Sequence, residues 1–140
     1  PYQYPEKALP LLISNLVDDI PFPLYGDGLN VRDWLFVIDH VRALELILNK
    51  GKPGEAYNVG GTHSTTNKDL VYRVLKTMGK PRAMIRRVPA RPGHDRRYAI
   101  DSGKLKSLGF RHAYSFPEAL AQTISWYRDH ESWWRPLKGA

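Results

Sequence analysis

The sequence has no cysteine, and this absence removes two classes of protein from consideration. A disulfide framework is impossible, and a thiolate metal site is excluded. No apolar run approaches the roughly 20 residues needed to span a bilayer, and no signal peptide precedes the first expected helix. We therefore expect a cytoplasmic protein that does not bind membranes.

Sequence motifs that carry catalysis are also missing. There is no G-x-x-G-x-x-G dinucleotide fingerprint, no P-loop and no G-x-S-x-G nucleophile elbow. The five histidines lack the spacing of metal ligands. Tyr72 and Lys76 form a Tyr-x-x-x-Lys pair, but such a pair arises often by chance, and no dinucleotide pattern precedes it. The residues therefore predict no catalytic residue, no cofactor ligand and no metal ligand within this chain.

What the sequence does have is an ordinary globular composition and an excess of positive charge. Its 140 residues are 42% hydrophobic and 25% charged, which is enough for one domain with a core. The net charge of +7 indicates an anionic partner, which could be a nucleic acid, an anionic membrane or a phosphorylated small molecule. The arginines are densest between residues 82 and 97.

Helical and extended patterns alternate along the chain and predict one mixed α/β domain over 1–140. Helices are expected over 5–19, 39–49, 67–79, 103–108 and 116–130, and short strands over 21–25, 31–37, 55–61 and 83–88. Asp39 is the expected N-cap of the second helix. The inward side chains of that helix are expected to be Val41, Leu44, Ile47 and Leu48. Strand, helix and strand over 31–61 predict a right-handed crossover.

A glycine pair, Gly60–Gly61, follows the extended segment over 55–59. Glycine lets another group approach the backbone closely, so the pair is a candidate for ligand contact. A simple turn at the end of a strand is the other interpretation.

The stretch Arg91–Asp101, RPGHDRRYAID, is too polar for a core strand and too rich in proline and glycine for a helix interior. Gly93 allows the chain to reverse with a positive φ, so Arg91 and His94 can point the same way. A guanidinium matches phosphate oxygens in pairs. The stretch predicts a phosphate or pyrophosphate clamp, and a solvated basic loop is the alternative.

Five segments of the chain are similar to those of a known family. They are PYQYPEKALPLLI, YGDGLNVRDWLFVIDHVRAL, AYNVGG, RPGHDRRYAID and WYRDHESWW. In this order they resemble the dTDP-glucose 4,6-dehydratases, which are extended short-chain dehydrogenases acting on nucleotide sugars. The second and third segments occur more loosely in nucleotide-sugar epimerases and decarboxylases, whereas RPGHDRRYAID is more particular to the dehydratases. The resemblance covers nearly all of this chain, but only the C-terminal part of the family's usual chain.

The resemblance implies a fold and a reaction. The chain would be the C-terminal substrate-binding part of an extended short-chain dehydrogenase, with mixed short strands and helices and without the NAD-binding Rossmann core. Residues 56–60 would form a strand at the edge of the absent Rossmann sheet. In the family, bound NAD takes hydride from C4 of glucose, water is lost across C5 and C6, and hydride returns at C6. NAD and the catalytic residues belong to the other half, so this chain alone is expected to be inactive.

The resemblance also implies which residues bind a dTDP-sugar. These are Arg32 and Arg91 for the diphosphate, Asn58 and His94 for the diphosphate and nucleoside, Pro23 and Tyr25 for the nucleoside pocket, and Lys7 at the border of the site. The full-length enzyme is expected to be a homodimer. Two alternatives remain open: a different nucleotide-sugar epimerase or decarboxylase, and a non-catalytic module that binds nucleotides or, through its arginines, nucleic acid.

Overall fold

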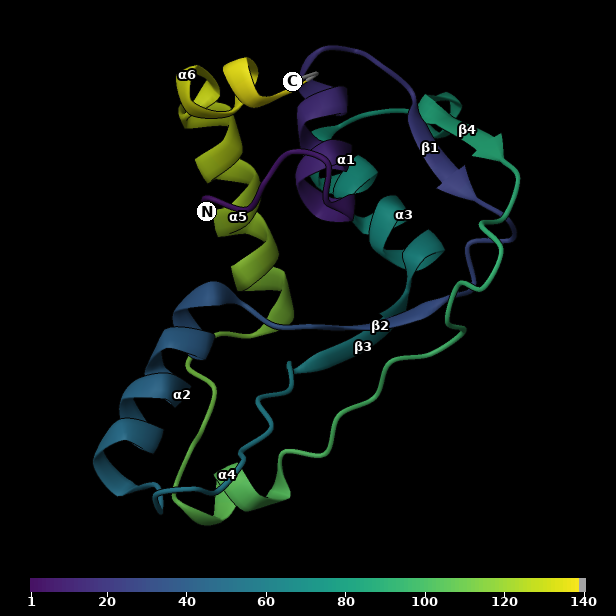
Figure 1. The fold of residues 1–140 in the computed structure, drawn as a ribbon. Helices are drawn as coiled ribbons and strands as arrows, with labels where there is room; N and C mark the ends of the chain where they lie inside the picture. Colours follow the sequence, from purple (N-terminus) through teal and green to yellow (C-terminus); the bar gives the residue numbers. More distant parts are fainter. Residues whose placement is uncertain (139–140) are drawn as a thin grey trace.

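The computed structural model describes residues 1–138, which form two regions joined by a small sheet and a long loop (Figure 1). The helices are α1 (Ala8–Val17), α2 (Val37–Lys50), α3 (Asn67–Met78), α4 (Gly103–Ser107), α5 (Phe116–Asp129) and α6 (Glu131–Trp134). The strands are β1 (Phe22–Tyr25), β2 (Val31–Trp34), β3 (His63–Thr66) and β4 (Ile85–Val88). Two short 3₁₀ helices, Arg82–Met84 and Arg135–Leu137, complete the elements. The mixed α/β class with short strands is therefore confirmed.

The first region, which we call the helical core, contains α1, α3, α5 and α6 together with β1 and β4. Helix α3 was predicted over 67–79, and its apolar side chains at helical spacing are buried: Leu70, Val71, Val74, Leu75 and Met78. The helix begins at the Thr66 cap, whose hydroxyl accepts a hydrogen bond from the Asp69 amide at 3.0 Å. It ends at Gly79, which adopts a φ of +67°. Local signals and burial agree throughout this region.

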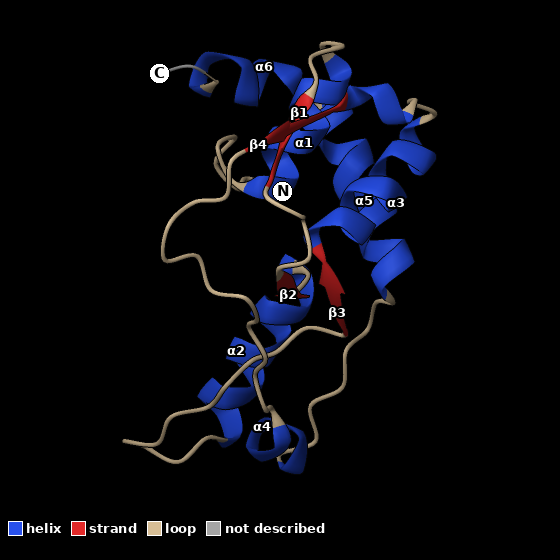
Figure 2. Cartoon of the chain, turned by 90° about the vertical axis from the view of Figure 1, so that its right-hand side faces the viewer, coloured by secondary structure: helices blue, strands red, loops and turns tan. Residues whose placement is uncertain are grey.

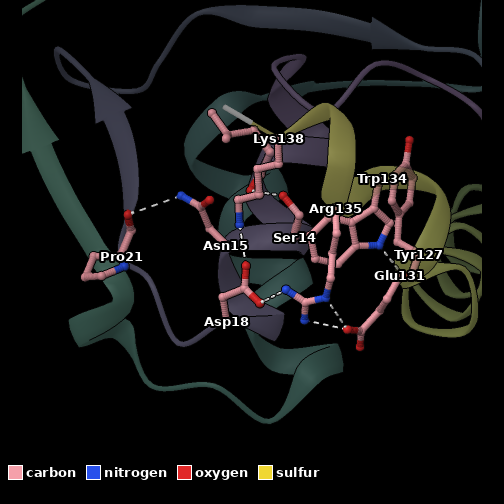
Figure 3. A network of polar contacts seen from close by, with 10 residues as sticks. Ser14, Asn15, Asp18, Pro21, Tyr127, Glu131, Trp134, Arg135 and Lys138 are labelled. Atoms are coloured by element: carbon pink, nitrogen blue, oxygen red, sulfur yellow. Dashed lines mark hydrogen bonds and ion pairs between the residues drawn. The ribbon is translucent and has the colours of Figure 1, made fainter. Parts of the chain in front are cut away.

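The C-terminal end of the chain is fastened to α1 (Figure 3). Trp134 is fully buried, and its indole nitrogen donates to the Tyr127 carbonyl at 2.7 Å. Asp18, at the end of α1, accepts from Lys138 at 2.7 Å and pairs with Arg135 at 2.9 Å. Burial raises the pKa of this carboxyl, but the hydrogen bonds from these two cations outweigh that effect and lower the pKa overall. These contacts join the end of α1, near the start of the chain, to residues 135–138 near its end.

The four strands form two separate two-stranded sheets. β1 pairs in parallel with β4, with Phe22 opposite Ile85, and β2 pairs antiparallel with β3, with Trp34 opposite His63. The β3 strand was not predicted, because its sequence HSTT has no apolar alternation. The predicted extent of β2 is also too long, since the chain is already helical at Val37.

The second region, the α2–α4 region, has a much smaller core. Its buried apolar side chains are Ala43, Leu105 and Phe110. The predicted inward face of α2 is wrong: Val41, Leu44 and Leu48 are 55%, 52% and 86% exposed, and only the Ile47 side is packed. Within residues 1–138 no other element lies against that apolar face, so the helix contacts the chain through the side that carries Ala43.

The prediction that Asp39 caps α2 is also wrong. Phe36 is the N-cap, and Asp39 lies inside the first turn with its side chain 1% exposed. Its carboxylate accepts from the Ala113 amide at 2.8 Å and from Arg42 at 3.0 Å. A carboxylate buried in this way must be paired to be tolerated, and here it fastens the loop before α5 to α2.

Residues 55–61, predicted as a strand, form none in this structure, so the predicted crossover is absent. A strand needs a neighbour for its backbone hydrogen bonds, and none lies beside this segment within residues 1–138. A Cβ on Gly61 would lie 2.1 Å from the Trp34 carbonyl oxygen, and one on Gly60 would lie 2.7 Å from the Ser102 hydroxyl. The group that approaches the glycine pair is therefore the chain's own backbone and side chains.

The loop over residues 89–102 connects the two regions. Figure 2 shows it leaving β4 in the helical core and running past β2 to α4. It contains the whole RPGHDRRYAID stretch that the sequence singled out. Among residues 1–138, none of the helices combines the length and apolar character that crossing a bilayer requires.

Candidate functional site

A cavity of about 1190 Å³ lies where the start of α1, β1, β2 and the 89–102 loop meet. Six of the seven predicted site residues line it: Lys7, Pro23, Tyr25, Arg32, Arg91 and His94. Apolar side chains such as Leu12 and Phe22 form much of the remaining wall. A largely apolar cavity with a few charged groups is the usual form of a small-molecule site.

Arg32 enters the cavity from β2, and its guanidinium is held in three ways. It donates to the Val31 carbonyl at 2.7 Å and to the Asp95 carbonyl at 2.9 Å. It also lies over the Tyr98 ring, with 4.1 Å between the guanidinium carbon and the ring centroid. A guanidinium has five N–H donors, so these two bonds leave three donors for a ligand.

Arg91 reaches the cavity from the 89–102 loop, at the start of the predicted turn. Gly93 adopts a φ of +70°, which confirms the chain reversal. The Arg91 guanidinium lies over the Tyr25 ring at 4.2 Å and donates to the Tyr25 hydroxyl at 2.8 Å. The structure thus brings together two arginines that are separated by 59 positions in sequence, each oriented by a tyrosine.

The loop that carries Arg91 is fastened to β2 by its backbone. The Val31 amide donates to the Arg96 carbonyl at 2.8 Å, and the Tyr98 amide donates to the Val31 carbonyl at 3.1 Å. The Arg96 side chain pairs with Asp27 at 2.9 Å and does not line the cavity. The amide of Leu29 and this arginine together lower the pKa of the Asp27 carboxyl. Arg96 therefore fastens the loop to Asp27 and is not part of the cavity wall.

Lys7 and His94 lie at the exposed border of the cavity. Lys7 is the N-cap of α1 and pairs with Glu6 at 3.0 Å, a contact that contributes little to stability at such an exposed site. The helix begins at Ala8, three residues later than predicted.

Asn58 is the one predicted site residue that the structure does not bring to the cavity. It is exposed, on the segment over 55–61. The end of that segment is held elsewhere: the Gly60 amide donates to the Ser102 hydroxyl and the Gly61 amide to the Asp33 carboxylate, both at 2.8 Å. A ligand contact by Asn58 stays a prediction.

The cavity also contains residues that the sequence reasoning missed, among them Phe36, His40 and Tyr98. Tyr98 had a usable signal, since an aromatic ring close in sequence to several arginines is a frequent partner for a guanidinium. Phe36 and His40 lie at the N-cap and in the first turn of α2, which begins at Val37 and thus two residues earlier than predicted.

The residues present do not form a site for a dinucleotide. Within residues 1–138, no strand runs through a glycine-rich turn into a helix, which is the arrangement that binds a pyrophosphate of NAD. The described residues also contain no group of three or more histidine, aspartate or glutamate side chains that could hold a metal ion. What the cavity can do is hold an anion between two guanidinium groups against apolar walls.

Comparison with known proteins decides the family. The family model for GDP-mannose 4,6 dehydratase matches residues 1–123. The chain belongs to this family. Among curated relatives, the dTDP-glucose 4,6-dehydratase of Streptomyces niveus is 48% identical over 139 residues, which is 99% of this chain and 41% of the relative. The resemblance stated from the motifs is therefore confirmed.

Solved structures agree with this assignment. DesIV, a dTDP-glucose 4,6-dehydratase from Streptomyces venezuelae with NAD and TYD bound, has a TM-score of 0.94 and 46% identity, covering 98% of this chain and 43% of that one. A UDP-glucose 4-epimerase from Thermotoga maritima with UDP-glucose has a TM-score of 0.85 and 28% identity, covering 92% of this chain and 42% of that one. The chain spans about two fifths of the length of the relatives that it matches.

Proposed function

We propose that this chain is the nucleotide-sugar-binding part of a dTDP-glucose 4,6-dehydratase, a lyase that converts dTDP-glucose to dTDP-4-keto-6-deoxyglucose and water. In this proposal NAD and the catalytic residues belong to the rest of a cytoplasmic, homodimeric protein. This chain contributes the groups that hold the diphosphate and the nucleoside.

The observation that carries the proposal is the pair of oriented arginines. Arg32 from β2 and Arg91 from the 89–102 loop line one cavity, and each guanidinium keeps donors that no group within residues 1–138 uses. Two fixed guanidinium groups suit the several oxygens of a diphosphate, because each can bind oxygens in pairs. The apolar wall beside them suits a nucleoside.

Two substitutions test the proposal in the full translated product that carries residues 1–140. Arg32→Ala and Arg91→Ala should each weaken dTDP binding by at least about ten-fold, since a charge-assisted hydrogen bond contributes about 1.5–3 kcal/mol. Calorimetric titration with dTDP measures the effect. Arg96→Ala is the matched control, because it removes the same charge from the same loop while its side chain pairs with Asp27 outside the cavity.

The control variant should bind dTDP as the unmodified protein does. If both arginine variants bind dTDP normally, or if Arg96→Ala weakens binding equally, the proposal is refuted. Titration with single-stranded DNA addresses the nucleic-acid alternative. Tight binding of DNA with a steep salt dependence and no response to dTDP would favour that alternative.

Product analysis separates the dehydratase from a nucleotide-sugar epimerase. The dehydratase should release dTDP-4-keto-6-deoxyglucose from dTDP-glucose, whereas an epimerase would keep all the oxygen atoms of the sugar. The higher identity to dTDP-glucose dehydratases than to the UDP-glucose epimerase, 46% against 28% among solved structures, supports the first outcome.

We also propose that residues 56–60 form an edge strand of a Rossmann sheet in the longer protein. Two observations within residues 1–138 support the proposal: no strand pairs with this segment, and the apolar face of α2 is exposed. Hydrogen exchange tests it: the amides of residues 56–60 should exchange slowly in the longer protein and rapidly in residues 1–140 alone.

A further inference from the structure

The two guanidinium–tyrosine contacts at the cavity are reciprocal. In one contact the 89–102 loop supplies the cation, Arg91, and β1 supplies the ring, Tyr25. In the other, β2 supplies the cation, Arg32, and the loop supplies the ring, Tyr98. The two contacts have nearly the same separation between guanidinium carbon and ring centroid, 4.2 and 4.1 Å.

Tyr98 is itself held firmly beneath Arg32. Its hydroxyl donates to the Asp95 carboxylate at 2.8 Å, and its amide donates to the Val31 carbonyl at 3.1 Å. The same Val31 carbonyl accepts from Arg32, and the Asp95 carbonyl accepts from Arg32 as well. Tyr98 and Arg32 therefore share the Val31 carbonyl as acceptor, and both bond to Asp95, the first through its carboxylate and the second through its carbonyl.

We propose that Tyr98 is a positioning residue that holds Arg32 ready for the diphosphate of the ligand. This inference rests on the proposed function. A free arginine side chain has many rotamers, and restraining them before binding removes an entropic penalty from the binding step. The ring face also attracts the cation without using any N–H donor, so all three remaining donors of Arg32 stay available.

A different role for Tyr98, as an anchor for the loop alone, makes different predictions. An anchor would act through its hydroxyl and its bond to Asp95, and its loss would weaken binding whether or not Arg32 is present. A positioning residue acts through its ring, and its effect disappears when Arg32 is absent. The two roles can therefore be separated by a double-mutant cycle.

The test measures dTDP affinity by calorimetry in the full translated product that carries residues 1–140. Tyr98→Leu should weaken binding by about three- to thirty-fold, the range of a cation–π contact. Tyr98→Phe keeps the ring and should stay within about two-fold of the unmodified protein. In the Arg32→Ala background, Tyr98→Leu should cause no further loss. With dTDP-glucose as substrate, Tyr98→Leu should raise KM and leave kcat unchanged.

Equal losses from Tyr98→Leu in both backgrounds would overturn the inference, as would an equal loss from Tyr98→Phe or no loss from Tyr98→Leu. Tyr98→Ser is a second ring-free variant, and thermal unfolding checks that each variant is folded. The proposed function fails by a different result, namely unchanged dTDP binding in Arg32→Ala itself.

Discussion

The helical core and the α2–α4 region differ in how much of their apolar surface they bury. Helices α1, α3 and α5 turn their apolar faces toward one another and enclose fourteen buried side chains. Helix α2 is as long as α5, yet its apolar stripe faces solvent, and the apolar cluster beside it has three buried residues. An amphipathic helix is stable in isolation only to a limited degree. Within residues 1–138 the first region therefore buries its apolar helix faces, whereas the apolar face of α2 is exposed.

A matched pair of leucine substitutions gives the largest expected contrast between the regions. Leu12 is fully buried in α1, whereas Leu48 on α2 is 86% exposed. In residues 1–140, Leu12→Ala should lower the free energy of unfolding by about 2–5 kcal/mol. Leu48→Ala should change it by less than about 0.5 kcal/mol. Urea denaturation measures both, and comparable losses would show that α2 is packed as tightly as α1.

A pH series on Tyr127 sharpens the description of the helical core. Burial raises the pKa of this phenol from 10.0 to about 12, and its hydroxyl donates to the Gln3 carbonyl. Because the pKa is higher in the folded chain than in the unfolded one, the neutral phenol contributes to the free energy of unfolding. The contribution is fully present below pH 10 and is lost as the pH rises toward 12. The loss is on the order of 2 kcal/mol.

The variant Tyr127→Phe isolates this effect from the titration of lysines. The phenol's pKa is 10.0 in the unfolded chain and about 12 in the folded one. When the pH rises from 9 to 12, the free energy of unfolding should therefore fall more for the unmodified chain than for the variant. Parallel stability curves for the two proteins would contradict the burial of Tyr127.

Asp39 is the group on which the attachment of α2 depends. In Asp39→Asn, one carboxylate oxygen becomes an NH₂ group and the other becomes a weaker, neutral acceptor. The backbone N–H groups of Ala113 and Tyr114 then lose part of their hydrogen bonding, and the free energy of unfolding should fall by about 1–3 kcal/mol. The loss should concentrate in the second region. Hydrogen exchange should accelerate at Ala113 and Tyr114 and along α2, but not along α3.

Glu45→Gln is the matched control for Asp39, because Glu45 is an exposed acid on the same helix. It should leave the exchange pattern unchanged. A uniform acceleration across both regions in Asp39→Asn would show that they unfold as one unit and would remove the distinction between them.

The smallest effect on stability is expected on the apolar stripe of α2. Leu44→Ser should change the free energy of unfolding of residues 1–140 by only a few tenths of a kcal/mol, because the side chain is already exposed. It should reduce self-association, which exposed apolar patches promote. Sedimentation velocity measures this, and unchanged association would place the contact elsewhere, for example at residues 56–60.

Prediction from sequence was more accurate for the helical core than for the α2–α4 region. The helix predicted over 67–79 was correct, because its apolar pattern of Leu70, Val74 and Met78 is buried by contacts that form within this chain. The apolar stripe of Leu44 and Leu48 obeys the same periodicity, yet it is exposed. Periodicity indicates which face of a helix is apolar, and it does not say whether the covering element belongs to the same chain.

The candidate site shows a similar limit. Arg32 and Arg91, which the family resemblance implies for one site, line the same cavity. Sequence reasoning missed Tyr98: an aromatic ring near several arginines is a usable signal, but its place beside β2 depends on a parallel bridge between Val31 and Arg97 that no local pattern encodes. Gly60–Gly61 was a candidate for ligand contact or a simple turn, and Trp34 and Ser102 occupy the space beside the pair.

The 89–102 loop has a thermodynamic consequence. One end holds Arg91 against Tyr25 beside the helical core, and the other end reaches Ser102, which accepts the Gly60 amide of the second region. If a ligand that restrains Arg91 also restrains the chain that leads to α4, the two events are coupled. Such coupling is reciprocal. The ligand then raises the equilibrium constant for ordering the α2–α4 region by some factor. A contact that orders this region raises the affinity of the cavity for the ligand by the same factor.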